Sequence, residues 1–314
     1  MKIKSLVLLY ILFVCALCAC KKDIEEELLK EEQKLAEYIT ATYGDAAISL
    51  GGGAYLVKTH EETEGAKVEA GNYILWNRKI NNQITGELEY TSDLSSVRYP
   101  DSYVHGGPEI TVVLSSKIDD GLTQMKQGEK GNVYIPSRWL FLDFQPRVFY
   151  VEIVEVISDL TVYQETMMSG HIKRLQHRGA SVDTIKNVVS TIDGKEYNVM
   201  YHIMDKGSGD EVTNGMNVET KTGISYMIQE NEVHPYTSVD QDLTWSTTTG
   251  KINTLTKTNC MGEILLKEKV KKGGKLVVTM PSKLYWDDDD LPKNQQEQFL
   301  IPKWSVVVFT ITIN

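Results

Sequence analysis

Residues 117–141 read KIDDGLTQMKQGEKGNVYIPSRWLF, and residues 260–286 read CMGEILLKEKVKKGGKLVVTMPSKLYW. Both stretches have a short apolar segment, a turn rich in lysine and glycine, an apolar run, and then proline followed by serine. Constant spacing between matched residues is typical of duplicated modules. The sequence therefore predicts two copies of one fold. The matched residues lie 145 positions apart in each case, Gly128 with Gly273 and Pro136 with Pro281.

Each copy ends in a run in which apolar and polar residues alternate. The runs are VFYVEIVEV at 148–156 and SVVVFTITI at 305–313. This alternation predicts strands with Phe149 and Phe309 on the buried face. The economical assembly is an antiparallel sheet wrapped on one short helix, with a pocket between them. Apolar residues at helical spacing mark that helix: Ile118, Leu122 and Met125 in the first copy, and Met261, Ile264 and Leu265 in the second.

A longer helix is predicted before each module. Residues 23–43 read DIEEELLKEEQKLAEYITATY, and Gly44 is a typical stop. The apolar residues near one face of this helix are Ile24, Leu28, Leu35 and Ile39. A second polar helical stretch is predicted from Gln164 to Ser190, with a break at Gly179.

The start of the chain has the features of an export signal. Lys2 and Lys4 precede an apolar run from Leu6 to Ala19, which is short for a membrane span of about 20 residues. The LCAC motif that ends this run resembles the bacterial lipobox. The resemblance implies cleavage before Cys20 and attachment of lipid, including palmitate, to its sulfur. The alternative is an uncleaved anchor helix.

Cysteine usage and charge narrow the class of protein. Cys260 is the only cysteine after Cys20, so the mature chain has no disulfide to form. Without Lys2 and Lys4 the chain keeps 31 Lys and Arg against 43 Asp and Glu, a net charge of −12. Such an acidic balance argues against nucleic acid as a partner.

These features define the expected organisation. The fold class is α+β, with two modules that are each preceded by a helical segment. The charged run after Cys20 resembles the tethers of Bacteroidetes surface lipoproteins, which implies an outer-membrane lipid anchor with the chain facing the periplasm or the cell surface. The expected parts are a lipoprotein signal peptide at 1–20, a helical lead segment at 21–44, the first module at 45–160, a linker helix at 161–192 and the second module at 193–314.

The motif MKQGEKGNVYIPSRWLF followed by VFYVEIVEV resembles the end of an FKBP-type peptidyl-prolyl cis-trans isomerase domain. Upstream, GGGAYLVKTH, GNYILWNRKI and YTSDLSS fit the same family, as do DGKEYNVMYHIMDKGSGDEV, VETKTG and PYTSVDQD in the second copy. The resemblance covers nearly all of residues 45–314. It implies tandem FKBP-like modules whose partners are proline-containing peptides and unfolded or partner proteins. It requires no cofactor and no metal.

The resemblance also implies the residues of a prolyl pocket. In the first module these are Trp76, Tyr90, Ile118, Phe141 and Phe149. In the second they are Tyr236, Glu263, Tyr285 or Trp286, and Phe309, with Thr222 in the place of Trp76. The alternative for Trp76, Tyr90 and Phe149 is a purely structural role in the core.

Several residues differ from those that the family has in its pocket, and these differences lower the activity that we expect. The carboxylate of the family's pocket is replaced by Thr91 and Thr237, and Phe141 lacks the family's tyrosine hydroxyl. Thr222 and Glu263 are expected to admit water, which makes the second module degenerate. The first expectation is therefore a weak isomerase or folding helper that acts through the first module. The alternative is a non-catalytic surface lipoprotein that binds peptides or proteins and retains the fold.

Overall fold

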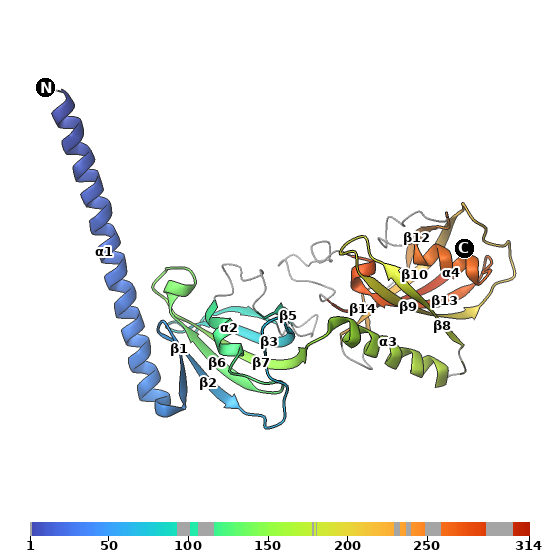
Figure 1. The fold of residues 1–314 in the computed structure, drawn as a ribbon, viewed down its shortest axis with the longest axis horizontal. Coiled ribbons are helices and arrows are strands. Elements are labelled where there is room, and N and C mark those ends of the chain that lie inside the picture. The colour runs from blue at the N-terminus through green and yellow to red at the C-terminus, as the bar shows by residue number, and fades with distance from the viewer. Residues whose placement is uncertain are drawn as a thin grey trace. The chain divides into compact units, whose positions relative to one another are not determined.

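The computed structural model describes the chain in two compact units, Met1–Ser158 and Asp159–Asn314 (Figure 1). Only the backbone is described within 2–22 and at 101–103 and 177. In the described part of the chain, no helix has the length and apolar character that crossing a membrane requires. The described residues are 2–92, 101–105, 116–177, 179, 181–228, 233–236, 240–248, 259–286 and 304–314.

The first unit is a long helix followed by an antiparallel sheet and one short helix. The order in the sheet is β1-β2-β6-β7-β3-β4, and β5 also pairs with β3. The elements are α1 (Lys2–Tyr43), η1 (Gly44–Ala46), β1 (Ala47–Gly51), β2 (Ala54–His60), β3 (Tyr73–Asn82), β4 (Leu88–Thr91), β5 (Asp101–Val104), α2 (Ser116–Leu122), β6 (Lys130–Ile135), η2 (Ser137–Trp139) and β7 (Arg147–Ile157).

The two faces of this sheet bury different helices. Along each strand, neighbouring side chains point to opposite faces. On one face Val133 and Phe149 pack with Ile118 of α2 in the main core. On the other face Tyr134 and Val148 pack with α1. The helix α1 is therefore part of the first unit and covers the side of the sheet that α2 leaves open.

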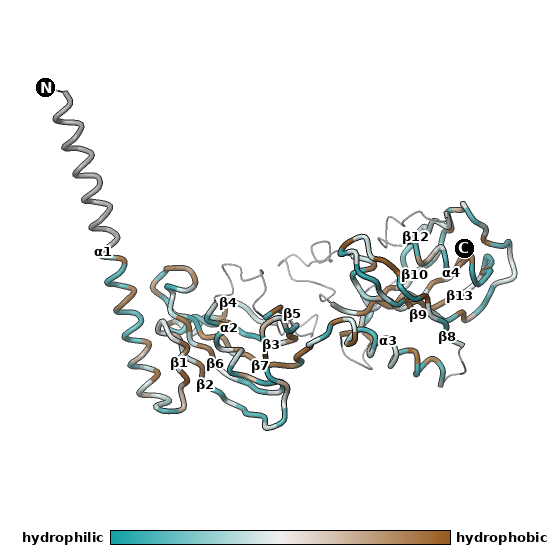
Figure 2. The backbone as a smooth tube through the Cα atoms, viewed as in Figure 1, coloured by the Kyte–Doolittle hydropathy of each residue, from teal (hydrophilic) through white to brown (hydrophobic). Residues whose placement is uncertain are grey.

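The predicted helix over residues 23–43 is confirmed, since α1 ends at Tyr43. Leu28, Leu35 and Ile39 are buried, whereas Ile24 is exposed. Brown and teal alternate along the described part of α1 in Figure 2, as expected for a helix with one packed face. The α1 residues that pack on the sheet are Leu35 and Ile39.

The second unit repeats this plan. Its sheet has the order β11-β10-β14-β13-β9-β8, and β12 pairs with β10. The elements are α3 (Leu160–His177), β8 (Val182–Val189), β9 (Glu196–Asp205), β10 (Asn217–Met227), β11 (His234–Pro235), β12 (Gln241–Ser246), α4 (Cys260–Lys267), β13 (Lys275–Pro281), η3 (Ser282–Leu284) and β14 (Val306–Ile313).

Strand register confirms the duplication. In the first unit Phe149 of β7 lies between Val133 and Ile80 on the neighbouring strands. In the second unit Phe309 of β14 lies between Val278 and Ile224. Phe149 and Phe309 therefore occupy the same place in two antiparallel modules, and both rings are buried.

The helical stretch predicted up to Ser190 is only partly a helix. The helix α3 ends at His177, and residues 182–189 form β8, which pairs with β9. Val182, Ile185 and Val188 are β-branched residues, which favour a strand that has a partner. The face of α3 with Met167 and Met168 packs on its own sheet, so α3 belongs to the second unit in the way α1 belongs to the first.

Candidate functional site

Four of the five residues predicted for the first pocket lie together. Trp76 of β3, Ile118 of α2 and Phe149 of β7 are at most 1% exposed and share one core cluster. Tyr90 of β4 is half-buried and packs against that cluster. In the described part of the unit, these side chains form packed core, with Tyr90 at its margin.

Phe141 does not join this group. Its side chain is 47% exposed, and the guanidinium carbon of Arg147 lies 5.3 Å from its ring centroid. The neighbouring Leu140 turns inward and packs in the core instead. The prediction that Phe141 lines the pocket is therefore wrong, because the chain after η2 presents Leu140 rather than Phe141 to the interior.

Arg78 was not foreseen as part of this site. Its guanidinium carbon lies 4.3 Å from the ring centroid of Tyr90 and 5.3 Å from that of Trp76. Arg78 is two residues after Trp76 on β3, so both side chains are on the same face of the sheet. A cation over two aromatic faces is a favourable contact, and it places a positive charge beside Tyr90 at the margin of the core.

The second unit holds a continuous aromatic cluster. The ring centroids of Tyr285 and Trp286 are 4.0 Å apart, and those of Tyr285 and Phe309 are 4.8 Å apart. Tyr236 meets Trp286 edge-on at 6.0 Å. Tyr236 and Trp286 are only partly buried, so the cluster runs from the core to the surface.

Trp245 of β12 completes the cluster from inside. Its ring centroid is 6.0 Å from that of Phe309, and its Nε1 donates a hydrogen bond of 2.9 Å to Thr220 Oγ1. Thr220 pairs with Ile313 as Trp76 pairs with Ile153 in the first unit. A strand distant in sequence therefore supplies the indole that β3 supplies in the first unit. No local pattern in the sequence indicates this exchange.

The same register corrects the predicted place of Thr222. Thr222 pairs with Ile311 as Arg78 pairs with Val151, so Thr220, and not Thr222, is the counterpart of Trp76. Thr222 is fully buried, and its hydroxyl is 2.9 Å from that of Thr220. A hydroxyl satisfied inside the sheet does not bring water into the module.

Glu263 is not the floor of the second pocket. It lies on the exposed face of α4, where Asn259 Nδ2 donates a hydrogen bond of 2.6 Å to its Oε1. The residues that face the core are Met261, Ile264 and Leu265, as their spacing predicted. The constant spacing fails here because the turn after α4 is longer: the N–H of Val270 donates to the carbonyl of Leu265, five residues back, whereas the N–H of Met125 donates to that of Leu122, three residues back.

The buried phenol of Tyr285 loses its proton less readily than a phenol in water. Burial of the phenol, with a smaller effect from the nearby Tyr236, raises the pKa of Tyr285 to about 12. The hydroxyl is therefore protonated near neutral pH and is available as a hydrogen-bond donor.

Of the other residues singled out in the sequence, Thr91 ends β4, while Thr237 lies outside the described residues. Cys20, which was predicted to carry lipid, is on α1, and its side chain is also outside the described part.

Comparison with known proteins adds structural neighbours only. No family model matches the chain, and no curated protein matches it. The solved structures that it matches include a peptidyl-prolyl cis-trans isomerase from Pseudomonas syringae pv. tomato, with 20% identity over 42% of this chain and 95% of that one, at a TM-score of 0.34.

Two further solved structures are similar to this chain. The three FKBP domains of wheat FKBP73 match 85% of this chain and 97% of that one at 14% identity and a TM-score of 0.29. FkpA from Escherichia coli matches 51% of this chain and 75% of that one at 18% identity and a TM-score of 0.35. The chain is an α+β protein with two modules that share one antiparallel plan, and the solved structures it is similar to include a peptidyl-prolyl cis-trans isomerase and a set of FKBP domains.

Proposed function

We propose that this protein is an FKBP-type folding helper that binds proline-containing segments of unfolded or partner proteins and isomerises them weakly. The observation that carries the proposal is the aromatic cluster of the second module, formed by Tyr236, Tyr285, Trp286 and Phe309. A proline ring packs well against aromatic faces, and this cluster reaches the surface.

The chemistry needs an apolar wall and a hydrogen-bond donor. Rotation about an X–Pro bond faces a barrier of about 20 kcal/mol that arises from amide resonance. The twisted amide is less polarised than the planar one, so a site that excludes water favours it. Tyr285 supplies a neutral hydroxyl that can donate to a substrate carbonyl.

The first module is the weaker site in this proposal. Trp76 and Phe149 are closed into the core, and Arg78 lies against the half-buried Tyr90. The two reasons for calling the second module degenerate were Thr222 and Glu263, and neither admits water to the cluster. We therefore assign the activity to the second module rather than the first.

Turnover is expected to be weak because Thr237 stands where the family has a carboxylate. Each hydrogen bond lost from the twisted amide costs about 1–3 kcal/mol, and about 1.4 kcal/mol is tenfold in rate. The second candidate function is therefore binding of peptides or proteins without catalysis. Thr91 is the corresponding substitution in the first module, so binding without catalysis is the second candidate for that module too.

Matched substitutions in the full chain test the proposal. Trp286→Ala removes a ring that contacts both Tyr285 and Tyr236, and Phe141→Ala removes its exposed counterpart. Binding of a proline-containing peptide should weaken about tenfold in Trp286→Ala and stay unchanged in Phe141→Ala. Binding without measurable isomerisation selects the non-catalytic candidate. Loss of binding in Phe141→Ala alone rejects the assignment to the second module.

We also propose that the protein is a lipoprotein anchored in the outer membrane through Cys20, with its modules facing the periplasm or the cell surface. The lipobox-like LCAC motif and the charged residues after it support this location. Cys20→Ala should release the protein from the membrane fraction, whereas Cys18→Ala should not. Equal membrane association of both variants rejects the anchor, and protease treatment of intact cells separates the two orientations.

A further inference from the structure

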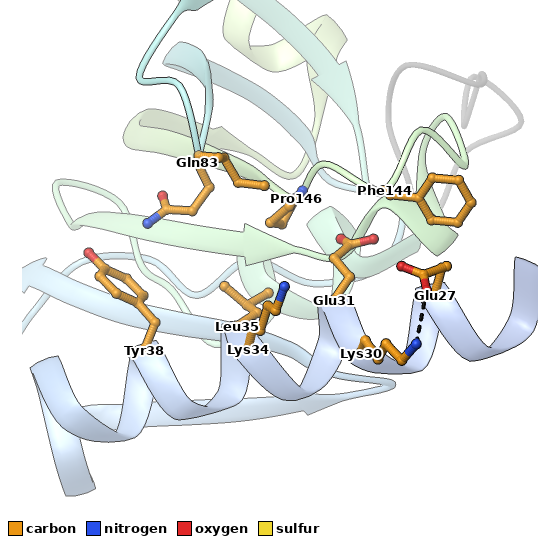
Figure 3. Close-up of a pocket in the computed structure, with 10 residues that line it drawn as sticks. Glu27, Lys30, Glu31, Lys34, Leu35, Tyr38, Gln83, Phe144 and Pro146 are labelled. Carbon is orange, nitrogen blue, oxygen red and sulfur yellow. Dashed lines mark hydrogen bonds and ion pairs between the residues drawn. The ribbon is translucent and has the colours of Figure 1, made fainter.

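A groove in the first unit lies between α1 and the body of the module. Its volume is about 400 Å³, and Leu35 and Tyr38 of α1 form one wall. The opposite wall includes Phe144 and Pro146 (Figure 3), and Ile84 also lines the groove. None of these residues belongs to the aromatic cluster of the second unit or to the first predicted pocket.

The groove has the length of a short extended peptide. Its lining on α1 runs from Glu27 to Tyr38, which corresponds to about 16 Å along the helix axis. An extended chain advances about 3.3 Å per residue, so about five residues match that length. The groove is therefore the size of a peptide segment rather than of one small ring.

The module holds apolar side chains toward solvent beside this groove. Ile84 is 66% exposed, and Phe144 is 38% exposed. Leu142 and Phe144 adopt left-handed φ angles of 55° and 59°, which cost free energy for residues with a side chain. Exposed apolar groups on a strained loop are typical of a surface that binds a partner.

Charge determines which segment fits. Glu31 lines the groove and is only 7% exposed, and its carboxylate accepts hydrogen bonds from the backbone N–H and the hydroxyl of Ser137. Among the described residues, no cation forms an ion pair with Glu31. Lys30, which also lines the groove, is engaged by Glu26 and Glu27.

The wider surface of α1 has the same sign. Residues 23–38 contain seven Asp and Glu and two Lys, one of which is Lys34 on the groove, and the whole chain has a formal charge of −10. A buried carboxylate without a cation is stabilised when a positive group approaches it. The field around the groove therefore attracts a cationic segment and repels an acidic one.

We propose that this groove binds an extended peptide segment in which an apolar side chain is followed by a basic one. The apolar side chain packs between Leu35, Ile84 and Phe144, and the basic group approaches Glu31. Proline is not required. This is a second binding site, and it belongs to a different unit from the proposed prolyl site.

The test uses two labelled proline-free heptapeptides, capped at both ends, that differ only in a central Leu-Leu-Lys or Leu-Leu-Glu. Fluorescence anisotropy measures their affinity for the full chain. The Lys peptide should bind at least about tenfold more tightly than the Glu peptide at low salt. Equal affinity of the two peptides, or no binding of the Lys peptide, overturns the proposal.

Two glycine substitutions supply matched variants. Phe144→Gly removes a wall of the groove, and Leu142→Gly removes an exposed side chain that does not line it. Glycine adopts positive φ readily, so both variants should fold. Phe144→Gly should weaken the Lys peptide about tenfold, and Leu142→Gly should change it less than about twofold. Ile84→Ser, at an exposed position, should also weaken binding and serves if Phe144→Gly misfolds.

The result is independent of the prolyl site. Trp286→Ala should leave binding of the Lys peptide unchanged, while Phe144→Gly should leave binding of a proline-containing peptide without basic residues unchanged. If Trp286→Ala weakens the Lys peptide and Phe144→Gly does not, the groove proposal is wrong and the prolyl site binds both peptides. If neither variant changes its own peptide, both proposals are wrong.

Discussion

Ser137→Ala and Ser282→Ala should affect stability very differently, although the two serines occupy the same place in the duplicated modules. Both follow the matched proline, both begin a 3-10 helix, and both are at most 1% exposed. The hydroxyl of Ser137 donates to Glu31 of α1, and its backbone N–H donates to the same carboxylate at 2.8 Å. The backbone N–H of Ser282 donates instead to the carbonyl of Ser305 at 2.9 Å.

The different surroundings of the two serine hydroxyls determine how much free energy of unfolding each substitution costs. A hydrogen bond to a charged group contributes about 1.5–3 kcal/mol, and Ser137→Ala leaves the buried Glu31 with one donor fewer. We expect a loss of about 2–3 kcal/mol in the first unit. The hydroxyl of Ser282 has no hydrogen-bond partner among the described residues. Removing it should change the second unit by less than about 0.5 kcal/mol or stabilise it slightly.

Amide hydrogen exchange read by mass spectrometry measures the two units separately in the full chain. Peptides from β6 report on the first unit and peptides from β13 on the second. Protection in β6 should fall by about thirtyfold or more in Ser137→Ala, because about 1.4 kcal/mol is tenfold. Equal losses for the two variants, or no loss for Ser137→Ala, would refute the account of how Glu31 holds α1.

Two further predictions concern the second unit. The pKa of Tyr285 is raised to about 12 from an ordinary 10.0, so the stabilisation from the neutral phenol is complete below pH 10 and is lost as the pH rises toward 12. Ultraviolet absorbance of tyrosinate and urea denaturation at a series of pH values should both detect this loss. Gly207→Ala should destabilise the unit by at least about 3 kcal/mol, since its φ is +75° and a Cβ would lie 2.5 Å from the carbonyl oxygen of Lys272. Gly194→Ala, at φ +70° with open space around it, should cost only about 1–2 kcal/mol in the same urea assay, and equal costs would contradict the steric argument.

Periodicity in the sequence was enough to predict the repeated plan. The helix up to Tyr43 and the strands around Phe149 and Phe309 follow from residues close together in the chain, and all are present. The short helices and their apolar faces were also predicted, because helical spacing over one or two turns determines which residues can face a core. The helix predicted beyond Gly179 failed because polar content alone did not distinguish it from a strand of β-branched residues.

The candidate site was less predictable, since it depends on register between distant strands. Trp76, Tyr90, Ile118 and Phe149 lie in or against one core cluster, whereas the outward position of Phe141 results from a local change of direction after η2. Counting back by a constant spacing misplaced Glu263, because the turn after α4 is two residues longer than the turn after α2.

By itself, the sequence determined the duplication, the alternating strands and the acidic character of the chain, because these depend on composition and on neighbours within a few residues. Only the tertiary structure decided which aromatic rings meet. Trp245 replaces the indole of Trp76 from a different strand, and Glu31 bonds Ser137 across 106 residues. Such contacts depend on where the backbone places two distant segments, and no local periodicity encodes that placement.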